Sequence, residues 1–375
     1  MRILVTGAKG FIGKNLIAEL HNRGYADIYS CDMDTTEEEL KSYCKDCEFV
    51  FNLAGVNRPK NETDFMTGNF GFASKLMQEL EDSKNTCPIM NASSIQAVLD
   101  NPYGKSKKAG EDALRIYGEK TGAKIYTYRF PNAFGKWSRP NYNSVIATFC
   151  YNIAREIPIQ INDATVTMNL VYIDDLVKEI ILCMEGKPHQ NEDGFCFVTR
   201  VYEITLGEIV RLLTSFKESR KNRTLPNMIK DSFEKKLYST YLSFLPNDQF
   251  SYPLEMHEDE RGSFTEMLRT ISNGQFSVNI SKPGVIKGNH WHHTKNEKFI
   301  VVSGNALFQF RKYGEQEVIE YHVSSKKMKV VDIPPGYTHS IINEGETDLV
   351  TFIWSNECYD KEVPDTIYEE VKRDE

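Results

Sequence analysis

The first part of the chain alternates short apolar, β-branched runs with longer amphipathic segments. This order is typical of βαβ units, in which helices connect the parallel strands of one sheet. We expect strands over residues 2–6, 27–31, 48–53, 88–91 and 124–128, and helices over residues 14–22, 36–43, 71–80 and 105–117. The N-terminal part is therefore predicted to be an α/β domain with a doubly wound parallel sheet.

The pattern changes twice further along the chain. Residues 130–244 are more helical, with helices expected over 144–155 and 174–184 and a capping box at Thr205 and Glu208. A polar break follows at 245–250, and beyond it short alternating runs cover 274–280, 298–303, 306–311, 318–323, 327–333 and 349–354. Many short strands predict a sandwich or jelly roll. We expect a domain over 1–244 with a substrate lobe, a linker over 245–250 and an all-β domain over 251–375.

Charge and composition exclude several partners. The chain has 45 basic and 53 acidic residues, a net charge of -8 and a pI of about 5.6, which leaves no electrostatic footprint for nucleic acid. No apolar run approaches the roughly 18 residues of a membrane helix, and a strand-like run has begun by Ile3. We expect a soluble cytoplasmic protein without membrane insertion, and we interpret its eight scattered cysteines as reduced thiols.

A glycine-rich turn directly follows the first expected strand and opens a helix. The sequence Gly7-Ala-Lys-Gly10-Phe11-Ile12-Gly13 lets the backbone come close to a pyrophosphate at the positive end of that helix. Asp32 lies 19 residues past Gly13, where a carboxylate could accept hydrogen bonds from a ribose 2′-hydroxyl. Asp32 would repel a 2′-phosphate, so it favours NADH over NADPH.

A second element consists of Tyr103-Gly-Lys-Ser-Lys107, with Ser93-Ser94 at the end of the fourth expected strand. On a helix Tyr103 and Lys107 are one turn apart, so the ammonium could lower the pKa of the phenol and reach a nicotinamide ribose. Such a tyrosine could give a proton to a ketone oxygen, and Ser94 could hydrogen-bond the same oxygen. The spacing leaves the choice between Ser93 and Ser94 open.

These residues resemble the extended short-chain dehydrogenase/reductase family over residues 1 to about 240. Further stretches that carry the resemblance are Asn52-Leu53-Ala54-Gly55, Tyr128-Arg-Phe-Pro-Asn132-Ala-Phe-Gly135 and Val171-Tyr-Ile-Asp-Asp175. The resemblance implies a Rossmann-like fold and, mostly, nucleotide-sugar substrates. It also implies that Leu53, Ala54 and Gly55 line the cofactor, that Asn69 supports the catalytic residues, and that Asn132 meets the sugar nucleotide.

Histidines gather near the C-terminus, where five of the eight lie between His290 and His339. In a strand, His290 and His292 face the same way and could bind one ion together. Glu297 needs an intervening turn to join them, and His339 would complete the set. Three imidazoles and a carboxylate suit Zn²⁺, Fe²⁺ or Mn²⁺. His293 and His322 are interpreted as peripheral.

The motif around these ligands resembles the cupin superfamily over about residues 250–370 and implies an all-β cupin jelly roll. Just upstream, Asp259-Glu-Arg261-Gly-Ser-Phe264-Thr-Glu266 is similar to a stretch of deoxysugar 3,5-epimerases. Arg261 and Glu266 are therefore candidate substrate contacts. Glu266, Tyr337 and Lys287 are the candidates for a catalytic base.

Over its whole length the chain is similar to a family of bifunctional capsular polysaccharide synthesis enzymes. The resemblance implies a homodimer and a UDP-2-acetamido-2,6-dideoxy-hexos-4-ulose substrate, which is epimerised at C3 by the cupin and reduced at C4 with NADPH to the L-talose sugar, on the route to UDP-N-acetyl-L-fucosamine. Asp32 instead predicts that NADH serves at least comparably. Three alternatives stay open: a reductase with a non-epimerase metal cupin, a metal-dependent oxygenase cupin, and a non-catalytic redox-sensing protein.

Overall fold

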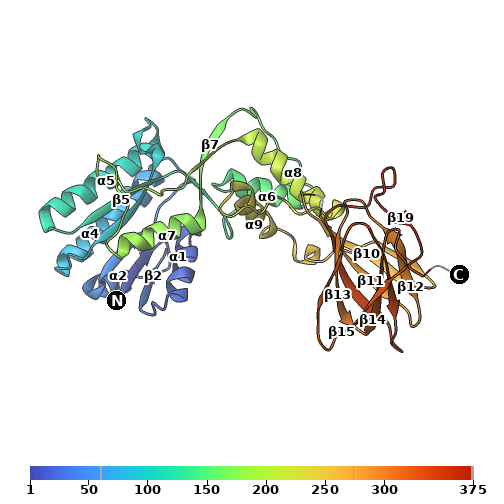
Figure 1. Ribbon diagram of the computed structural model, residues 1–375. Coiled ribbons are helices and arrows are strands. Elements are labelled where there is room, and N and C mark those ends of the chain that lie inside the picture. The colour runs from blue at the N-terminus through green and yellow to red at the C-terminus, as the bar shows by residue number, and fades with distance from the viewer. Residues whose placement is uncertain (60, 273, 373–375) are drawn as a thin grey trace. The chain divides into compact units, whose positions relative to one another are not determined.

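The computed structural model describes residues 1–59, 61–272 and 274–372, and the chain divides into two compact units (Figure 1). The N-terminal unit comprises Met1–Ser215 and Asp231–Pro246, and the C-terminal unit comprises Phe216–Lys230 and Asn247–Glu375. The segment 216–230 was expected in the first domain but packs with the second unit. The domain limits 1–244 and 251–375 remain a proposal.

The N-terminal unit contains the predicted parallel sheet, in the order β2-β1-β3-β4-β5. Its strands are β1 (Ile3–Thr6), β2 (Ile28–Cys31), β3 (Phe49–Asn52), β4 (Ile89–Ser94) and β5 (Ile125–Phe130). From β1 the chain first adds β2 on one side, and it then crosses to the other side of β1 to add β3, so the order of strands reverses between the neighbours β1 and β3. In such a sheet, ligands bind in the crevice outside the carboxyl ends of the strands at this reversal.

Both faces of this sheet are buried, which explains why the central strands β1 and β3 are apolar at all but their last positions. Ile3 and Val5 of β1 pack into one core with Leu16 and Leu20 of α1, while Leu4 packs into a second core on the other face. Helices α1 (Phe11–Asn22) and α7 (Ile173–Met184) pack together, and α2 (Glu37–Asp46), α4 (Phe72–Asp82) and α5 (Pro102–Thr121) form the other layer (Figure 1). The predicted helices are present, with ends displaced by a few residues.

Local signals set several of these helix ends. Thr36 and Glu39 form a capping box at the start of α2. Asn101 caps α5, Pro102 occupies its first turn, and Gly122 ends it in the left-handed conformation. Between β3 and α4 the short helix α3 (Thr63–Phe65) runs into a π-helical turn, η1 (Met66–Gly71).

The remaining part of the N-terminal unit forms a smaller lobe around a three-stranded sheet. The strands β6 (Asn132–Phe134), β7 (Thr167–Tyr172) and β8 (Tyr202–Thr205) pair in this order, β6 parallel and β8 antiparallel to β7. The helices of this region are α6 (Val145–Ala154), the first part of α8 (Leu206–Asn222) and α9 (Phe233–Leu242). The 3₁₀ turn η2 (Ile95–Val98) follows β4, and η3 (Asn247–Gln249) begins the second part of the C-terminal unit.

The C-terminal unit contains two antiparallel sheets (Figure 1). The six-stranded sheet has the order β16-β13-β18-β11-β10-β9, and the five-stranded sheet has the order β15-β14-β17-β12-β19. The strands are β9 (Met256–Asp259), β10 (Gly262–Arg269), β11 (Gln275–Ser281), β12 (Ile286–Trp291), β13 (Glu297–Ser303), β14 (Asn305–Lys312), β15 (Val318–Ser324), β16 (Val330–Ile333), β17 (Tyr337–Asn343), β18 (Leu349–Ser355) and β19 (Ile367–Tyr368). Phe299, Phe308 and Ile341, from both sheets, share one buried core.

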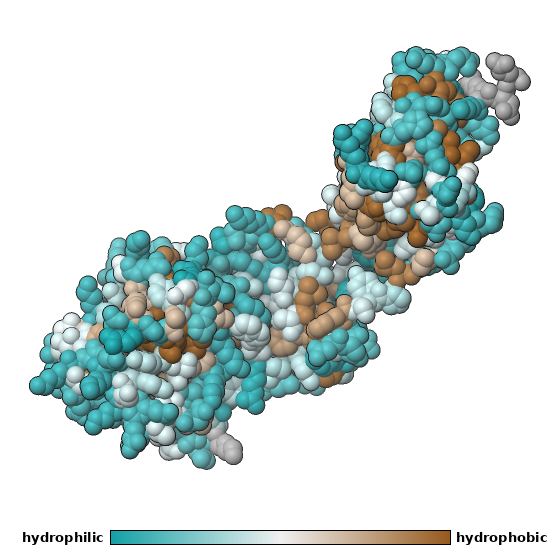
Figure 2. Space-filling view, turned by 90° about the horizontal axis from the view of Figure 1, so that it is seen from below, coloured by the Kyte–Doolittle hydropathy of each residue, from teal (hydrophilic) through white to brown (hydrophobic). Residues whose placement is uncertain are grey.

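The surface mixes hydrophilic and hydrophobic residues, and hydrophobic ones are prominent on the C-terminal unit in the view of Figure 2. Phe276, Val330 and Phe352 are exposed, and the strand pairing places them on one face of the six-stranded sheet. Among the described residues, none of the helices combines the length and apolar character needed to cross a bilayer.

Candidate active sites

The glycine turn lies between β1 and α1, beside the start of the loop after β3. Gly7 has φ +64°, and a Cβ there would come within 2.9 Å of the Ala54 backbone nitrogen. A Cβ on Gly13 would lie 2.3 Å from the Gly7 carbonyl oxygen. Glycine is therefore required at both positions, and the bare backbone forms a cradle that fits the pyrophosphate of a dinucleotide.

Polar contacts hold the loops around this cradle. The Thr6 hydroxyl accepts hydrogen bonds from the amides of Leu53 and Ala54, each at 3.1 Å. The Asp32 carboxylate accepts one from the Lys9 amide at 2.7 Å and one from the Met33 amide at 2.9 Å. Asp32 thus lies beside the glycine turn, with its oxygens bound to backbone amides.

The structure separates the two neighbouring serines at the end of β4. Ser93 donates to Glu111 at 2.6 Å, and Glu111 also binds the Arg129 guanidinium through both carboxylate oxygens. Ser94 Oγ instead accepts from the Gln96 amide at 3.2 Å and lies close enough to Tyr103 to lower the pKa of its phenol. Because successive strand residues face opposite sides, Ser94 is the serine beside the tyrosine.

The surroundings of Tyr103 act on the pKa of its phenol. Burial raises the pKa of Tyr103, and the neighbouring Ser94 opposes this rise. The expected lowering of the phenol's pKa by the Lys107 ammonium stays a prediction. Burial lowers the pKa of Lys107 itself to about 8, and its Nζ donates to the Ala92 carbonyl at 3.1 Å.

Gly55 and Asn69 complete the surroundings of Lys107. A Cβ on Gly55 would lie 2.9 Å from Lys107 Nζ and 2.8 Å from Asn69 Oδ1, so only glycine leaves room for both side chains. The Asn69 amide is fixed by hydrogen bonds with both backbone groups of Val56 and with Ser106 Oγ, at 2.9–3.1 Å. The structure thus brings Asn69 and Lys107 together at Gly55.

Asn132 lies in a separate pocket of about 430 Å³ in the N-terminal unit. Arg58, Tyr142 and Ser144 also line it, and Ser144 caps the start of α6. The pocket therefore offers one cation, several amides and an aromatic ring. Sequence reasoning missed Arg58, which is part of a loop and carries no periodic signal.

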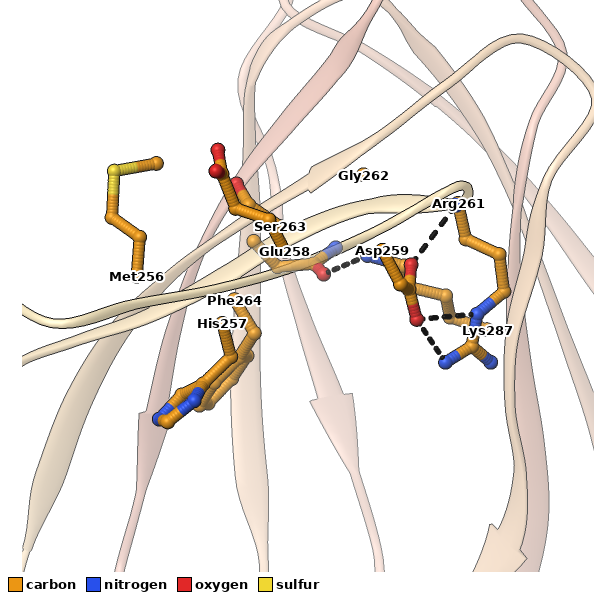
Figure 3. Close-up of a pocket in the computed structure, with 10 residues that line it drawn as sticks. Met256, His257, Glu258, Asp259, Arg261, Gly262, Ser263, Phe264 and Lys287 are labelled. Carbon is orange, nitrogen blue, oxygen red and sulfur yellow. Dashed lines mark hydrogen bonds and ion pairs between the residues drawn. The ribbon is translucent and has the colours of Figure 1, made fainter.

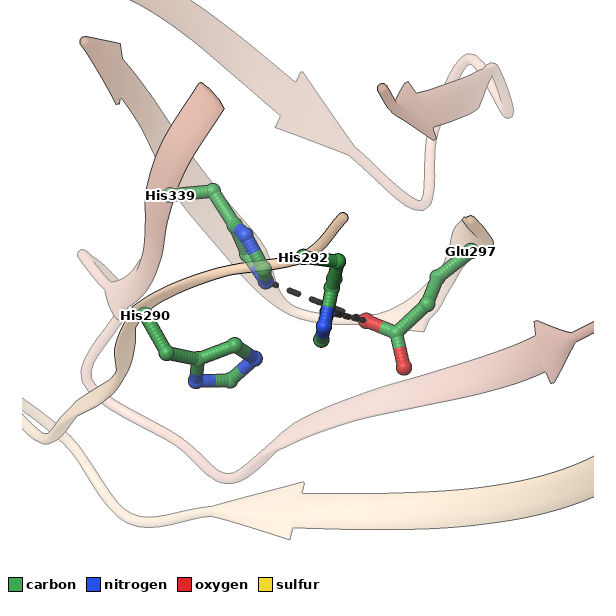
Figure 4. A group of neighbouring side chains, drawn as sticks. All are labelled: His290, His292, Glu297 and His339. Carbon is green, nitrogen blue, oxygen red and sulfur yellow. Dashed lines mark ion pairs between the residues drawn. The ribbon is translucent and has the colours of Figure 1, made fainter. Parts of the chain in front are cut away.

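In the C-terminal unit His290, His292, Glu297 and His339 come together, with one ligand atom of each within 4.8 Å of the others (Figure 4). His290 on β12 is paired with His339 on β17, and His292 follows directly after β12. Glu297 begins β13 in the facing sheet, so the expected turn does intervene. The cluster thus lies between the two sheets.

The protonation states of the cluster suit metal ligation. Burial lowers the pKa of His339 to about 3 and also lowers that of His290, which keeps these imidazoles neutral. Burial opposes ionisation of Glu297, but the neighbouring His292 and the charge of Lys295 hold its pKa well below the usual range. His292 Nε2 and His339 Nδ1 are buried without a hydrogen-bond partner. Two neutral imidazoles, a carboxylate and two buried ring nitrogens without a partner fit a transition-metal ion.

Contacts around Glu297 define which oxygen faces the cluster. Oε1 lies 3.2 Å from Lys295 Nζ and accepts from Ser355 at 3.0 Å. Oε2 lies 3.7 Å from His292 Nε2 and 3.8 Å from His339 Nε2. Sequence reasoning missed Lys295, although it is two residues before Glu297.

His293 and His322 lie outside the cluster. His293 donates its amide to Asp365, and the exposed His322 pairs with Glu344 at 2.9 Å.

The C-terminal unit also has a pocket of about 540 Å³, which is lined by Arg261 and Lys287 among others (Figure 3). Arg261 pairs with Asp259 at 2.6 Å, while Lys287 Nζ donates to Asn279 Oδ1 and the Ile280 carbonyl, each at 2.8 Å. Burial lowers the pKa of Lys287, which makes it a better base near neutral pH.

The structure does not bring Glu266 to this pocket. It lies between Arg269, at 2.7 Å, and Arg223, at 2.9 Å. Although burial opposes ionisation, hydrogen bonds from these two arginines lower the pKa of Glu266, which weakens it as a base. Tyr337, the third candidate, is on β17 two residues before His339 and packs against the core of the unit.

Comparison with known proteins agrees with this architecture. The model of the NAD dependent epimerase/dehydratase family matches residues 3–194, which include the glycine cradle, Tyr103 and Lys107. The chain belongs to this family. A polysaccharide biosynthesis C-terminal domain model matches residues 257–367, which include the metal-ligand cluster.

Two known proteins align with this chain along almost its whole length. UDP-2-acetamido-2,6-beta-L-arabino-hexul-4-ose reductase of Pseudomonas aeruginosa is 44% identical, over 98% of both chains. The crystal structure of the capsular polysaccharide assembling protein CapF from Staphylococcus aureus is 54% identical, with a TM-score of 0.94 over 99% of this chain and 100% of that one. UDP-glucose 4-epimerase of Thermotoga maritima shares the fold at 20% identity, with a TM-score of 0.54 over 65% of this chain and 98% of that one.

Membership in the NAD dependent epimerase/dehydratase family implies a nicotinamide cofactor, and the glycine cradle fits one. The predicted Rossmann-like domain is thereby confirmed. The C-terminal unit is confirmed as a domain rich in antiparallel sheet, whereas its identification as a cupin remains a proposal.

Proposed function

We propose that the protein is a bifunctional nucleotide-sugar enzyme whose N-terminal unit reduces the C4 ketone of a UDP-2-acetamido-2,6-dideoxy-hexos-4-ulose. The observation that carries this proposal is the placement of Ser94 beside Tyr103, with Lys107 on the same helix, behind a glycine cradle. A binding protein without catalysis would need only the cradle. The substrate class follows from the reductase of Pseudomonas aeruginosa, to which the chain is 44% identical.

The reduction assigns one task to each side chain. A nicotinamide cofactor, when bound, supplies the hydride. Tyr103 donates its proton to the ketone oxygen, and Ser94 orients that oxygen by a hydrogen bond. Lys107, whose Nζ donates to the Ala92 carbonyl, stabilises the phenolate that remains. Binding of the UDP moiety is assigned to the pocket of Arg58 and Asn132, where the cation would meet a phosphate.

We further infer that the C-terminal unit is a cupin that epimerises C3 before this reduction. A C4 ketone acidifies the C3 proton, and reduction removes that acidity, so epimerisation must come first. His290, His292, Glu297 and His339 would hold Zn²⁺, with Fe²⁺ or Mn²⁺ as alternatives, and such an ion would supply Lewis acidity for the enolate oxygen. Lys287 and Tyr337 remain the candidate bases. The product is UDP-2-acetamido-2,6-dideoxy-L-talose, on the route to UDP-N-acetyl-L-fucosamine for a capsule, and the enzyme is proposed to act as a cytoplasmic homodimer.

Hydrogen exchange at C3 tests the two assignments together. The zinc-loaded full-length protein is incubated with the UDP-4-keto sugar in deuterated water without a nicotinamide cofactor, and deuterium at C3 is followed by NMR. We expect exchange in the wild type and in Tyr103→Phe, and its loss in His290→Ala. His322→Ala, which removes an exposed histidine outside the cluster, serves as the control and should exchange normally.

Added NADPH or NADH then separates the second step. Wild type should form the reduced sugar, whereas Tyr103→Phe should exchange C3 and accumulate the ketone. Exchange that survives His290→Ala would refute the epimerase assignment, and full reduction by Tyr103→Phe would refute the reductase assignment.

A further inference from the structure

The C-terminal strap, which we define as Asp365–Val371, lies against the strand and the loop that carry two of the cluster's histidines. Within the strap, β19 pairs with β12 so that Tyr368 is opposite His290 and Ile367 is opposite Trp291. The strap is thus an added edge strand of the five-stranded sheet. It is about 70 residues away in sequence from the histidines that it contacts.

Asp365 binds the loop that follows His292 through its carboxylate. Both oxygens together accept from the amides of His293, Thr294 and Lys295 at 2.7–2.8 Å. Although some burial opposes ionisation, these backbone hydrogen bonds hold the pKa of Asp365 well below its usual range, so the carboxylate is charged at neutral pH. Asp365 therefore ties the first three residues of the loop between His292 and Glu297 to the strap.

The backbone carbonyl of the same residue sets the tautomer of His292. His292 Nδ1 is hydrogen-bonded to the Asp365 oxygen, and a carbonyl can only accept. The proton must therefore be on Nδ1, which leaves the lone pair on Nε2. Nε2 is buried without a hydrogen-bond partner and lies 3.7 Å from Glu297 Oε2.

A buried arginine anchors the other end of the strap. Arg311 on β14 is 1% exposed, and its guanidinium donates to the carbonyls of Glu370 and Val371, each at 2.8 Å, and to the Glu369 carboxylate at 2.9 Å. Without the strap this buried cation would lose these partners, which is costly. Asn289, the neighbour of His290, accepts from the amide of Glu369 at 3.0 Å.

We propose that the C-terminal strap is a positioning element of the metal site, which fixes the Nδ1–H tautomer of His292 and the loop from His292 to Glu297. Docking of the strap and binding of the ion then stabilise each other, because each favours the same arrangement of His292. The inference rests on the proposed metal site but not on the proposed reaction.

Zinc affinity of the full-length protein tests this coupling. We expect Asp365→Ala to weaken Zn²⁺ binding by about 10–100-fold, measured by competition with a chelating dye. Asp360→Ala is the matched control. Asp360 lies shortly before the strap, and its carboxylate accepts from the Glu362 amide without contacting the cluster. Equal zinc affinity of the two variants would overturn the proposal.

The tautomer of His292 gives a second measurement, made on the metal-free protein. In ¹⁵N-histidine NMR spectra, His292, assigned by its absence in His292→Gln, should show the Nδ1–H form. Asp365→Ala keeps the backbone carbonyl at residue 365 but loses the carboxylate contacts that hold the strap to the loop, so the Nε2–H form should become populated as the strap detaches. An Nε2–H form in the wild type would overturn the proposal even if Asp365→Ala fails to fold. If both measurements succeed while C3 exchange fails, the strap assignment stands and the proposed epimerase function falls.

Discussion

Replacing Lys107 by methionine should stabilise the protein at neutral pH while abolishing ketone reduction. The pKa of this lysine is lowered from 10.5 to about 8 because burial disfavours the charged form. A shift of about 2.5 units at about 1.36 kcal/mol per unit corresponds to about 3.4 kcal/mol of unfavourable free energy below pH 8. Because the Lys107 side chain is only partly buried, solvent screens its charge, and we reduce this free energy by about half, to roughly 1.7 kcal/mol.

The lost hydrogen bond to the Ala92 carbonyl offsets about 0.5–1 kcal/mol of this gain. Lys107→Met should therefore raise the free energy of unfolding by about 1 kcal/mol at pH 7, or the Tm by about 2–4 °C for a unit of this size. A folded-state pKa below the unfolded value means that the unfolded chain binds more protons between pH 8 and 10.5. Wild-type stability relative to the variant thus rises through this window, and the advantage of the variant should disappear by about pH 10.

Urea unfolding followed by far-UV circular dichroism at pH 7 and pH 10 provides the measurement. Lys108→Met is the control on the same helix, because Lys108 is exposed and pairs with Asp112 at the surface. We expect it to change stability by less than about 0.5 kcal/mol at both pH values. A Lys107→Met variant that is less stable than wild type at pH 7, or whose stability difference does not change with pH, would refute the reasoning.

Two further predictions concern the dinucleotide site. Gly13→Ala should lower NAD(P)H affinity at least about tenfold by calorimetry, because its Cβ would be 2.3 Å from the Gly7 carbonyl oxygen, whereas Gly110→Ala, whose Cβ would meet nothing within 4 Å, should bind normally. Asp32 beside the cradle should allow NADH to be used at least comparably with NADPH, and an NADPH preference above about a hundredfold in kcat/KM, close to 3 kcal/mol, would show that Asp32 does not face the ribose.

The parallel sheet was predictable because its residues carry the signal locally. Ile3, Leu4 and Val5 pack into cores on both faces of β1, so the strand is apolar at all but its last position, and the glycines that follow it mark the turn. By contrast, β12 contains lysine, glycine, asparagine and histidine, and a bulge between Gly288 and His290 breaks its alternation. Its strand character comes from pairing with β17, which is distant in sequence.

The candidate sites show the same limit. The four residues of the histidine and glutamate cluster could be named from their spacing, but the sequence could not show that Glu297 approaches from the facing sheet or that the Asp365 carbonyl binds His292. The choice between Ser93 and Ser94 needed the position of α5 relative to β4. Glu266 was expected at the substrate. Its partner Arg269 is three residues away on the same strand, but the pairing with Arg223 depends on the segment 216–230, which packs with the C-terminal unit.

Because of the π-helical turn η1, the number of residues between β3 and α4 decides where the Asn69 side chain points. A π turn holds one residue more than an α-helical turn, and each helical residue advances the side-chain direction by about 100°. Deleting a single residue within Met66–Gly71 would let the segment relax to regular α-helix and would rotate Asn69 away from Val56 and Ser106 while leaving α4 in place. Natural insertions and deletions here should therefore be tolerated only when they preserve the phase of Asn69.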